Sequence, residues 1–207
     1  MKTTKTIFAT MAMSIVAMFL TANLYADVYL NVLPLETSKK VLVELTPPAK
    51  STVTIYLYNE KGQLVYNEDI KEGSSYKKVF DFSNARNGIH TIVSDSKYLK
   101  ETKEIKVEGT SIEVVSTKYL HRPVFTVKDD VLRIKYLNPT QSNVKLSIEN
   151  SAKTYFNRDM PSEAVFIKSF DLKKLSPGNY TVSFEVDGYE FTHYITKDYK
   201  NHIVSDL

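Results

Sequence analysis

The feature that most constrains the fold is the alternation of apolar and polar side chains along much of the chain. It is clearest in Val53-Thr-Ile55-Tyr-Leu57 and in Val144-Lys-Leu146-Ser-Ile148. A period of two is typical of a strand with one face in a core and the other in water. The alternating segments are short, recur at roughly ten-residue intervals and are separated by Asn, Gly, Pro and Ser, so the sequence predicts an all-β chain of antiparallel sandwiches.

One pattern occurs twice, at an offset of 90 residues. The segment from Phe80 to Ile92 overlies the segment 170–182, and Val41-Leu42 matches Val131-Leu132 at the same offset. Segments that stay in register over this distance indicate a tandem duplication.

Each half has the length of an independent domain. We therefore predict two tandem immunoglobulin-like domains, at residues 27–109 and 110–207, with residues 111–118 as a candidate strand that bridges them. The strands expected in the first half are 29–32, 41–45, 53–58, 64–68, 77–82, 88–94 and 103–107. Those expected in the second half are 124–127, 131–136, 144–149, 154–158, 165–171, 178–186 and 189–196.

Residues 1–26 differ from everything after them and have the pattern of a secretory signal peptide. Two lysines precede an uncharged run from Ile7 to Leu20, and Ala26 supplies a small residue at the cleavage point, with Ala22 as the alternative. A membrane-spanning helix needs about 20 apolar residues, so a retained anchor is the weaker interpretation. We expect an exported protein that is periplasmic, outer-membrane-associated or extracellular, with no transmembrane span in the mature chain.

Removal of this segment changes the charge balance. Without Lys2 and Lys5, the 27 basic side chains become 25 against 24 acidic ones, a net charge of +1, and the two signs are interspersed. Nucleic acid binding requires a basic face, so we expect no nucleic acid partner. The chain has no cysteine, which excludes disulfides, thiolate metal sites and cysteine nucleophiles.

Two aspartates, Asp81 and Asp171, recur at the same place in the pattern. Paired catalytic carboxylates must face each other across one cleft, whereas these two belong to separate predicted domains. We expect each aspartate to end a strand and to accept backbone hydrogen bonds in the following turn. Gly88 and Gly178 are expected to supply a positive φ before the next strand. These four residues form a predicted structural turn motif.

The remaining polar residues show no pattern that indicates chemistry. His90, His121, His193 and His202 lack the spacing of a zinc site, no calcium-binding loop is present, and no serine lies in a nucleophile motif. We therefore expect a protein that is not an enzyme, with no metal site and no cofactor. His90 aligns with Tyr180 and is expected to be a half-buried strand residue.

Outward tyrosines distinguish the first half from the second. If Val53, Ile55 and Leu57 face the core, Tyr56 and Tyr58 face outward, where the second half has polar side chains. Exposed tyrosines offer stacking surface for a sugar or flat area for a protein partner. Tyr56 and Tyr58 are the predicted binding residues, with Tyr66 as a neighbour; the alternative is that they pack against an adjacent loop or the other domain.

The segment Asp171-Leu172-Lys-Lys-Leu175-Ser-Pro-Gly178-Asn-Tyr180, which follows a strand–hairpin–strand pattern, resembles the C-terminal sorting domains of the type IX secretion system. Asp81, Phe82, Ala85, Gly88 and His90 form a looser copy of it. Related sandwich domains of unknown function in exported Bacteroidota proteins share these motifs. The resemblance implies the fold and an exported setting. It implies sorting less directly, because a sorting domain of this type occurs once, behind a large cargo, whereas here two copies fill the chain.

These observations predict an exported, non-catalytic binding or interaction module of the cell envelope that recognises a protein or another envelope component. One alternative is a carbohydrate-associated module that uses the exposed tyrosines. A second is a sorting or surface-attachment domain of type IX secretion. A small hydrolase with a carboxylate pair assembled between the domains is the weakest possibility.

Overall fold

The structure is a computed structural model that describes residues 29–35, 38–46, 51–199 and 203–205. The expected signal peptide at residues 1–26 lies outside these ranges. The described residues form sixteen strands in antiparallel sheets and no helix, which confirms the all-β sandwich fold. Accordingly, none of them forms a helix suited to crossing a membrane. The chain divides into two compact units between Arg122 and Pro123, here called the first and second units.

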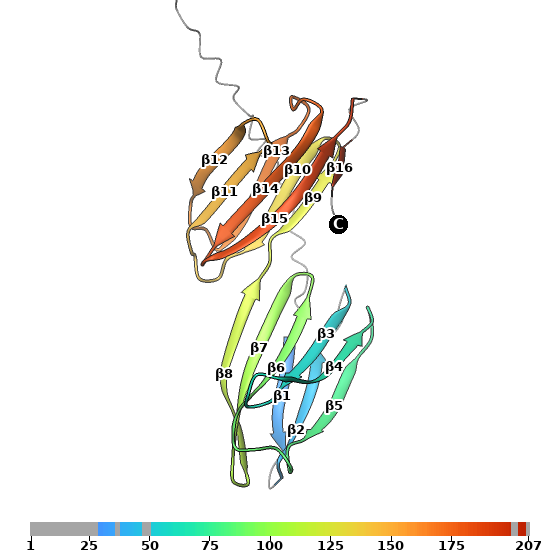
Figure 1. Cartoon of the computed structure of the whole chain (residues 1–207), viewed down its shortest axis with the longest axis vertical. Helices are drawn as coiled ribbons and strands as arrows, with labels where there is room; N and C mark the ends of the chain where they lie inside the picture. The colour runs from blue at the N-terminus through green and yellow to red at the C-terminus, as the bar shows by residue number, and fades with distance from the viewer. Residues whose placement is uncertain (1–28, 36–37, 47–50, 200–202, 206–207) are drawn as a thin grey trace, which may run out of the picture. The chain divides into compact units, whose positions relative to one another are not determined.

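The first unit contains two sheets (Figure 1). A three-stranded sheet has the order β1-β2-β5, and a five-stranded sheet has the order β4-β3-β6-β7-β8. Their inward side chains, such as Val43, Ile55 and Ile105, form one buried core. The strands are β1 (Tyr29–Leu35), β2 (Lys40–Thr46), β3 (Val53–Tyr58), β4 (Leu64–Ile70), β5 (Tyr76–Asp81), β6 (Gly88–Ser96), β7 (Leu99–Glu108) and β8 (Ser111–His121).

The second unit has the same arrangement of strands. Its three-stranded sheet contains β9, β10 and β13, and its five-stranded sheet has the order β12-β11-β14-β15-β16. A separate core includes Ile134, Leu146 and Phe184. The strands are β9 (Val124–Lys128), β10 (Val131–Leu137), β11 (Val144–Glu149), β12 (Thr154–Met160), β13 (Val165–Asp171), β14 (Gly178–Val186), β15 (Tyr189–Lys197) and β16 (Ile203–Ser205).

The division between the units differs from the one expected between residues 109 and 110. Strand β8 pairs with β7 from Leu99↔His121 to Glu108↔Ser111, so it completes the five-stranded sheet of the first unit. Gly109 has a φ of 57° and lies in the hairpin turn between these strands. The expected boundary therefore falls in a tight hairpin turn, and the strand expected to bridge the domains belongs to the first unit.

The pairing of β2 and β10 also corrects the sequence alignment. Val41 pairs with Phe80, and Leu132 pairs with Phe170. Because Phe80 and Phe170 are equivalent, Leu132 corresponds to Val41, and the offset in this strand is 91 residues rather than 90. A slip of one residue reverses the face of every side chain in a strand, and the corrected register places both Val41 and Leu132 in their cores.

The predicted facing of the central strands is confirmed. In β3 the side chains of Val53, Ile55 and Leu57 are buried. In β11 the buried side chains are Val144, Leu146 and Ile148. Hairpin turns connect the neighbouring strands at residues 59–62 and 187–188, with a φ of 73° at Gly62 and 77° at Gly188.

Candidate functional site

The repeated aspartates shape turns, as predicted. Asp81 Oδ1 accepts a hydrogen bond from the backbone N–H of Ser83 at 2.8 Å, and Asp171 Oδ1 accepts one from Lys173 at 2.9 Å. The hydrogen bonds from Ser83 hold the pKa of the Asp81 carboxyl below its usual range, with a smaller contribution from Lys40. Each carboxylate thus stabilises the chain reversal that follows its own strand.

The glycines of the turn motif have the backbone conformation that the sequence predicted. Gly88 begins β6 with a φ of 140°, and Gly178 begins β14 with a φ of 154°. A Cβ at Gly88 would lie 3.0 Å from the Cβ of Glu60, which is closer than side chains normally approach. Gly88 therefore lets the β5–β6 connection pass close to the β3–β4 hairpin.

Tyr56 and Tyr58 lie on the outer face of β3, as predicted. Their rings stack on each other with centroids 6.2 Å apart and an interplanar angle of 28°. Both side chains are partly buried, and Val93, which pairs with Tyr56 from β6, is 5% exposed. Much of the tyrosine surface therefore covers the sheet itself, and a smaller part is left for a ligand.

Tyr66, expected to be a neighbour of this pair, lies on the opposite face of the sheet. It pairs with the inward residue Leu57 and packs edge-on against Phe80, with ring centroids 5.1 Å apart. The register of the β3–β4 hairpin shifts at a bulge between Leu57 and Tyr58, and this shift determines which β4 side chains point inward. Tyr66 belongs to the edge of the core and is not part of a tyrosine patch.

A concavity of about 440 Å³ lies between the β3–β4 hairpin and the β5–β6 connection of the first unit. We call it the end concavity. The residues that line it are Leu57, Asn59, Glu60, Lys61, Gln63, Val65, Phe80, Asp81, Phe82, Asn84, Ala85, Arg86 and His90. It therefore brings Asp81 and His90 of the repeated motif together with the hairpin at residues 57–65.

The end concavity lies where the second unit has larger side chains. Ala85 and Leu175 occupy the same turn position, because their backbone N–H groups donate to Phe82 and to Leu172, respectively. Leu175 is 7% exposed and packs in the second core. With a methyl group in place of an isobutyl group, the first unit leaves this space unfilled.

A second sequence difference between the two units widens the opening in the first. The pairs Leu57↔Tyr66 and Ile148↔Phe156 make Val65 the counterpart of Tyr155. Tyr155 packs edge-on against Tyr180, with centroids 5.3 Å apart, and its hydroxyl accepts a hydrogen bond from Asn150. Val65 is too short to reach across in this way and is 55% exposed. Two positions together thus open the end of the first sandwich.

Charges of both signs surround the end concavity. Arg86 lies 4.0 Å from the carboxylate of Glu60, and Lys40 lies 3.6 Å from that of Asp81. The Glu60 side chain is 18% exposed, so much of this carboxylate is withdrawn from solvent. Among the lining residues themselves, Glu60 and Asp81 are balanced by Lys61 and Arg86, so the formal charge of the lining is close to zero.

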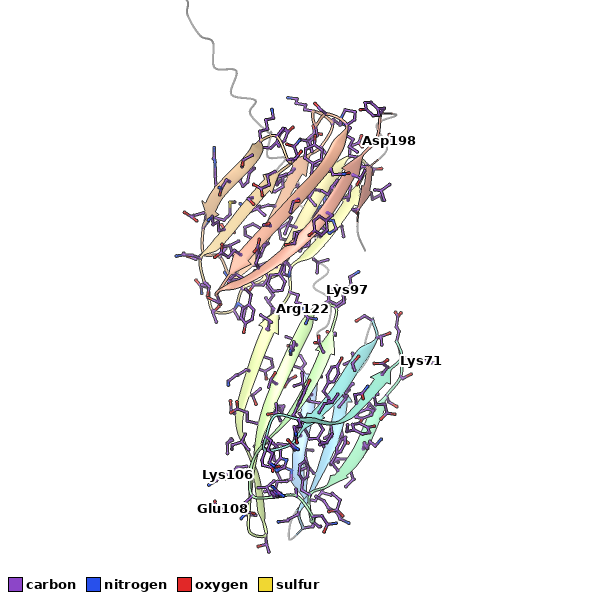
Figure 2. All side chains as sticks on the ribbon, in the orientation of Figure 1. Lys71, Lys97, Lys106, Glu108, Arg122 and Asp198 are labelled. Atoms are coloured by element: carbon purple, nitrogen blue, oxygen red, sulfur yellow. The ribbon has the colours of Figure 1, made fainter. Side chains whose placement is uncertain are left out.

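Elsewhere on the described surface, charged side chains also pair with the opposite sign. Lys106 and Glu108, both labelled in Figure 2, lie 2.6 Å apart at the end of β7. Arg122, labelled in the same figure, donates to Asp95 at 2.7 Å. Within the described ranges, no group of three or more His, Cys, Asp or Glu side chains is arranged to hold a metal ion.

The fold and its turn motifs define an antiparallel β-sandwich module. Residues 31–108 match the family described as "Secretion system C-terminal sorting domain". This range runs from β1 to β7 and contains the whole end concavity. The resemblance expected from the motif residues is thereby confirmed for the first unit, and the match indicates a secreted or cell-surface protein.

No curated protein matches the chain. A solved structure described as "Biofilm associated protein - BSP domain" is similar, with 14% sequence identity and a TM-score of 0.25. The similarity covers 79% of this chain and 28% of that one, so this chain spans little more than a quarter of that structure's length.

Sequence reasoning placed Asp81 and Gly88 in the turn that borders the end concavity but did not predict the concavity. Its lining comes from two connections, at 57–65 and 80–90, whose proximity depends on sheet pairing. One signal was available, because Ala85 aligns with Leu175 in the repeated motif. A small residue at a core position of only one copy predicts a hollow in that copy.

Proposed function

We propose that this chain is an exported, non-catalytic binding or interaction module of the cell envelope, which recognises a protein or another envelope component. The observation that carries the proposal is the end concavity, which one unit leaves open and the equivalent side chains of the other unit fill. Ligands usually bind in concave sites where polar groups converge beside apolar surface, and the end concavity has both kinds of group, with the polar side chains in the majority.

The non-catalytic part of the proposal is supported by the roles of the two motif carboxylates. Asp81 and Asp171 each accept hydrogen bonds in a turn of their own unit. A double Asp81→Asn/Asp171→Asn variant tests this part with generic ester and glycoside substrates. We expect no hydrolysis by the wild-type chain above the background of this variant. Hydrolysis that the double variant abolishes would refute a non-catalytic function.

Capture from envelope extract tests the binding part of the proposal. The tagged full chain is compared with Ala85→Leu, which places in the first unit the side chain that the second unit has at this position. The control is Ala152→Leu, the same substitution at an exposed position of the second unit. We expect the partner captured by the wild type and by Ala152→Leu to be lost with Ala85→Leu. Equal capture by all three proteins would exclude the end concavity as the binding site.

The tyrosine pair provides an alternative binding surface, for carbohydrate, that the same assay distinguishes. The double variant Tyr56→Ala/Tyr58→Ala removes both stacked rings on the outer face of β3. If capture depends on the end concavity, this variant retains it. Capture that is lost with the tyrosines and kept with Ala85→Leu would instead assign binding to the sheet face.

A second candidate function is sorting or surface attachment through type IX secretion, which the family match over residues 31–108 favours. It is tested by expressing the tagged full chain in a host with an intact type IX system and in a strain that lacks it. Protease accessibility on whole cells reports surface exposure. Sorting predicts that exposure is lost in the deficient strain, whereas equal exposure in both strains would argue against it.

A further inference from the structure

We infer that the end concavity binds a neutral sugar residue of an envelope glycan. This inference rests on the proposed function and specifies its ligand. The inferred carbohydrate site is therefore at the end of the first sandwich and not at the tyrosines on the sheet face. Its basis is the combination of charge balance, hydrogen-bonding groups and apolar floor in one concavity.

The charge balance disfavours strongly charged ligands, because two acidic side chains, Glu60 and Asp81, and two basic ones, Lys61 and Arg86, line the concavity. An anionic group that approached Arg86 would also meet the carboxylate of Glu60, 4.0 Å from that guanidinium. A cationic group that approached Asp81 would compete with Lys40, 3.6 Å away. Like charges so close to a ligand reduce its affinity. A neutral ligand is not repelled by either charge and can form hydrogen bonds with both members of each ion pair.

The polar lining suits hydroxyl groups. Gln63 and Asn84 offer amide donors and acceptors, and Asn59, whose Nδ2 donates to Gln63 Oε1 at 3.0 Å, keeps one further N–H donor. Glu60 adds acceptors, and Arg86 adds donors. A sugar hydroxyl both donates and accepts, so neighbouring hydroxyls on one ring can use donors and acceptors that alternate around a site. The hairpin also holds Asn59 in place, since its Oδ1 accepts hydrogen bonds from two backbone N–H groups, at 3.0 Å each.

Apolar side chains also line the end concavity. Leu57, Phe80, Phe82 and Ala85 contribute carbon surface, and the first three are at most 9% exposed, so they lie beneath the more exposed polar groups and form its floor. The C–H groups of a sugar ring present an apolar patch that can rest on such a floor. A volume of about 440 Å³ lies within the range of small-molecule sites, roughly 300–1,000 Å³. The site therefore has room for a ring, with walls for its hydroxyls and a floor for its carbon face.

The test uses protein-free envelope polysaccharide, prepared by protease digestion and phenol extraction, as the titrant in calorimetry of the full chain. Periodate, which cleaves vicinal diols, supplies the matched inactive polysaccharide. We expect binding by the wild type and by Ala152→Leu, a loss of at least about tenfold in affinity with Ala85→Leu, and no binding after periodate treatment.

A second variant keeps the test decisive if Ala85→Leu fails to fold, as judged by circular dichroism. Gln63→Ala/Asn84→Ala removes two exposed amides from the lining and leaves the core intact. We expect this double variant to lower the affinity for the polysaccharide by at least about tenfold.

The outcomes separate this inference from the proposed function. Absent binding of polysaccharide, or binding that neither set of substitutions weakens, would overturn the sugar assignment. If capture from untreated, protein-containing extract still depends on Ala85, the binding function stands and its ligand is a protein. If that capture is also independent of Ala85, both the inference and the proposed site fail.

Discussion

His90 Nε2 lies 2.9 Å from the carbonyl oxygen of Arg86 and closes the corner between β5 and β6. Tyr180 repeats the arrangement in the second unit, where its hydroxyl donates to the carbonyl of Ser176 at 2.6 Å. In both units a buried ring at the start of a strand thus bonds to the backbone four residues earlier. β-Sandwiches often have a tyrosine at such a corner whose hydroxyl forms a hydrogen bond with the backbone a few residues earlier in the chain. The sequence alignment of His90 with Tyr180 therefore reflects a shared structural role.

Removing this hydrogen bond should destabilise each corner. We expect His90→Phe and Tyr180→Phe each to lower the free energy of unfolding by about 1 kcal/mol, because a partly buried hydrogen bond to a backbone carbonyl is lost while the ring is kept. His90→Tyr should retain most of the stability, since it introduces the group used by the second unit. Urea unfolding followed by circular dichroism measures these differences. A loss with His90→Tyr as large as that with His90→Phe would show that the ring shape, and not the hydrogen bond, is what matters.

The two motif glycines should differ in their tolerance of a side chain. Gly88→Ala combines a φ of 140° with a Cβ 3.0 Å from the Cβ of Glu60, whereas at Gly178 a Cβ would lie 4.0 Å from the ring of Tyr180. Both variants incur backbone strain of about 1–3 kcal/mol, and Gly88→Ala adds a steric clash. We expect the lower midpoint of unfolding with Gly88→Ala. Equal midpoints for the two variants would mean that the hairpin carrying Glu60 moves aside without cost.

Local patterns predicted the fold because each one reports a local constraint. Alternation in Val53-Thr-Ile55-Tyr-Leu57 identifies the buried face of β3, and the aspartates and glycines identify turns through their own backbone chemistry. Local patterns do not determine the register between strands. The sequences Val41-Leu42 and Val131-Leu132 are identical, but in the structure Val41 is equivalent to Leu132. Two apolar neighbours in a strand cannot indicate which of them faces inward.

The candidate site was harder to predict for the same reason. Tyr66 faces inward because a bulge shifts the register of the β3–β4 hairpin, and a bulge of this kind leaves no clear mark in the sequence. Gly109 fits a linker and a hairpin equally well, which is why β8 was expected to lie in the second domain or between the domains. The end concavity depends on both hairpin register and sheet pairing, so only the Ala85–Leu175 difference pointed toward it.

Glu101 provides a prediction about a buried charge. Its carboxylate is 1% exposed, accepts a hydrogen bond from the Leu30 N–H at 2.8 Å and lies 3.2 Å from Lys103 Nζ. It therefore links β1 of one sheet to β7 of the other. Glu101→Ala leaves a buried N–H and a largely buried ammonium without this partner, so we expect a loss of about 3 kcal/mol in unfolding free energy.

The control for this prediction is Glu104→Ala, three residues further along the same strand. Glu104 pairs with Lys118 at 2.9 Å near the surface, with side chains 32% and 69% exposed, respectively. Exposed ion pairs contribute about 0–1 kcal/mol, so this variant should unfold near the wild-type midpoint. Comparable losses in the two variants, measured by urea unfolding, would contradict the bridging role of Glu101.

Glu68 should make a small, pH-dependent contribution to stability. The Tyr66 hydroxyl donates a hydrogen bond to its carboxylate, and Lys78 Nζ lies 3.1 Å from it; these interactions hold the pKa of Glu68 below its ordinary value near 4.5. A carboxyl whose pKa is lower in the folded state stabilises the fold fully above that ordinary value. The contribution is lost as the pH falls through the lowered pKa.

Thermal unfolding of Glu68→Gln beside the wild type tests this pH dependence. The side chains of Glu68 and Lys78 are 43% and 40% exposed, so we expect a difference of about 0.5 kcal/mol at about pH 7 that disappears at about pH 2. In a Lys78→Met background the same substitution should cost less at about pH 7, because the ammonium no longer interacts with the carboxylate. A difference between Glu68→Gln and the wild type that persists in acid would show that it comes from packing and not from charge.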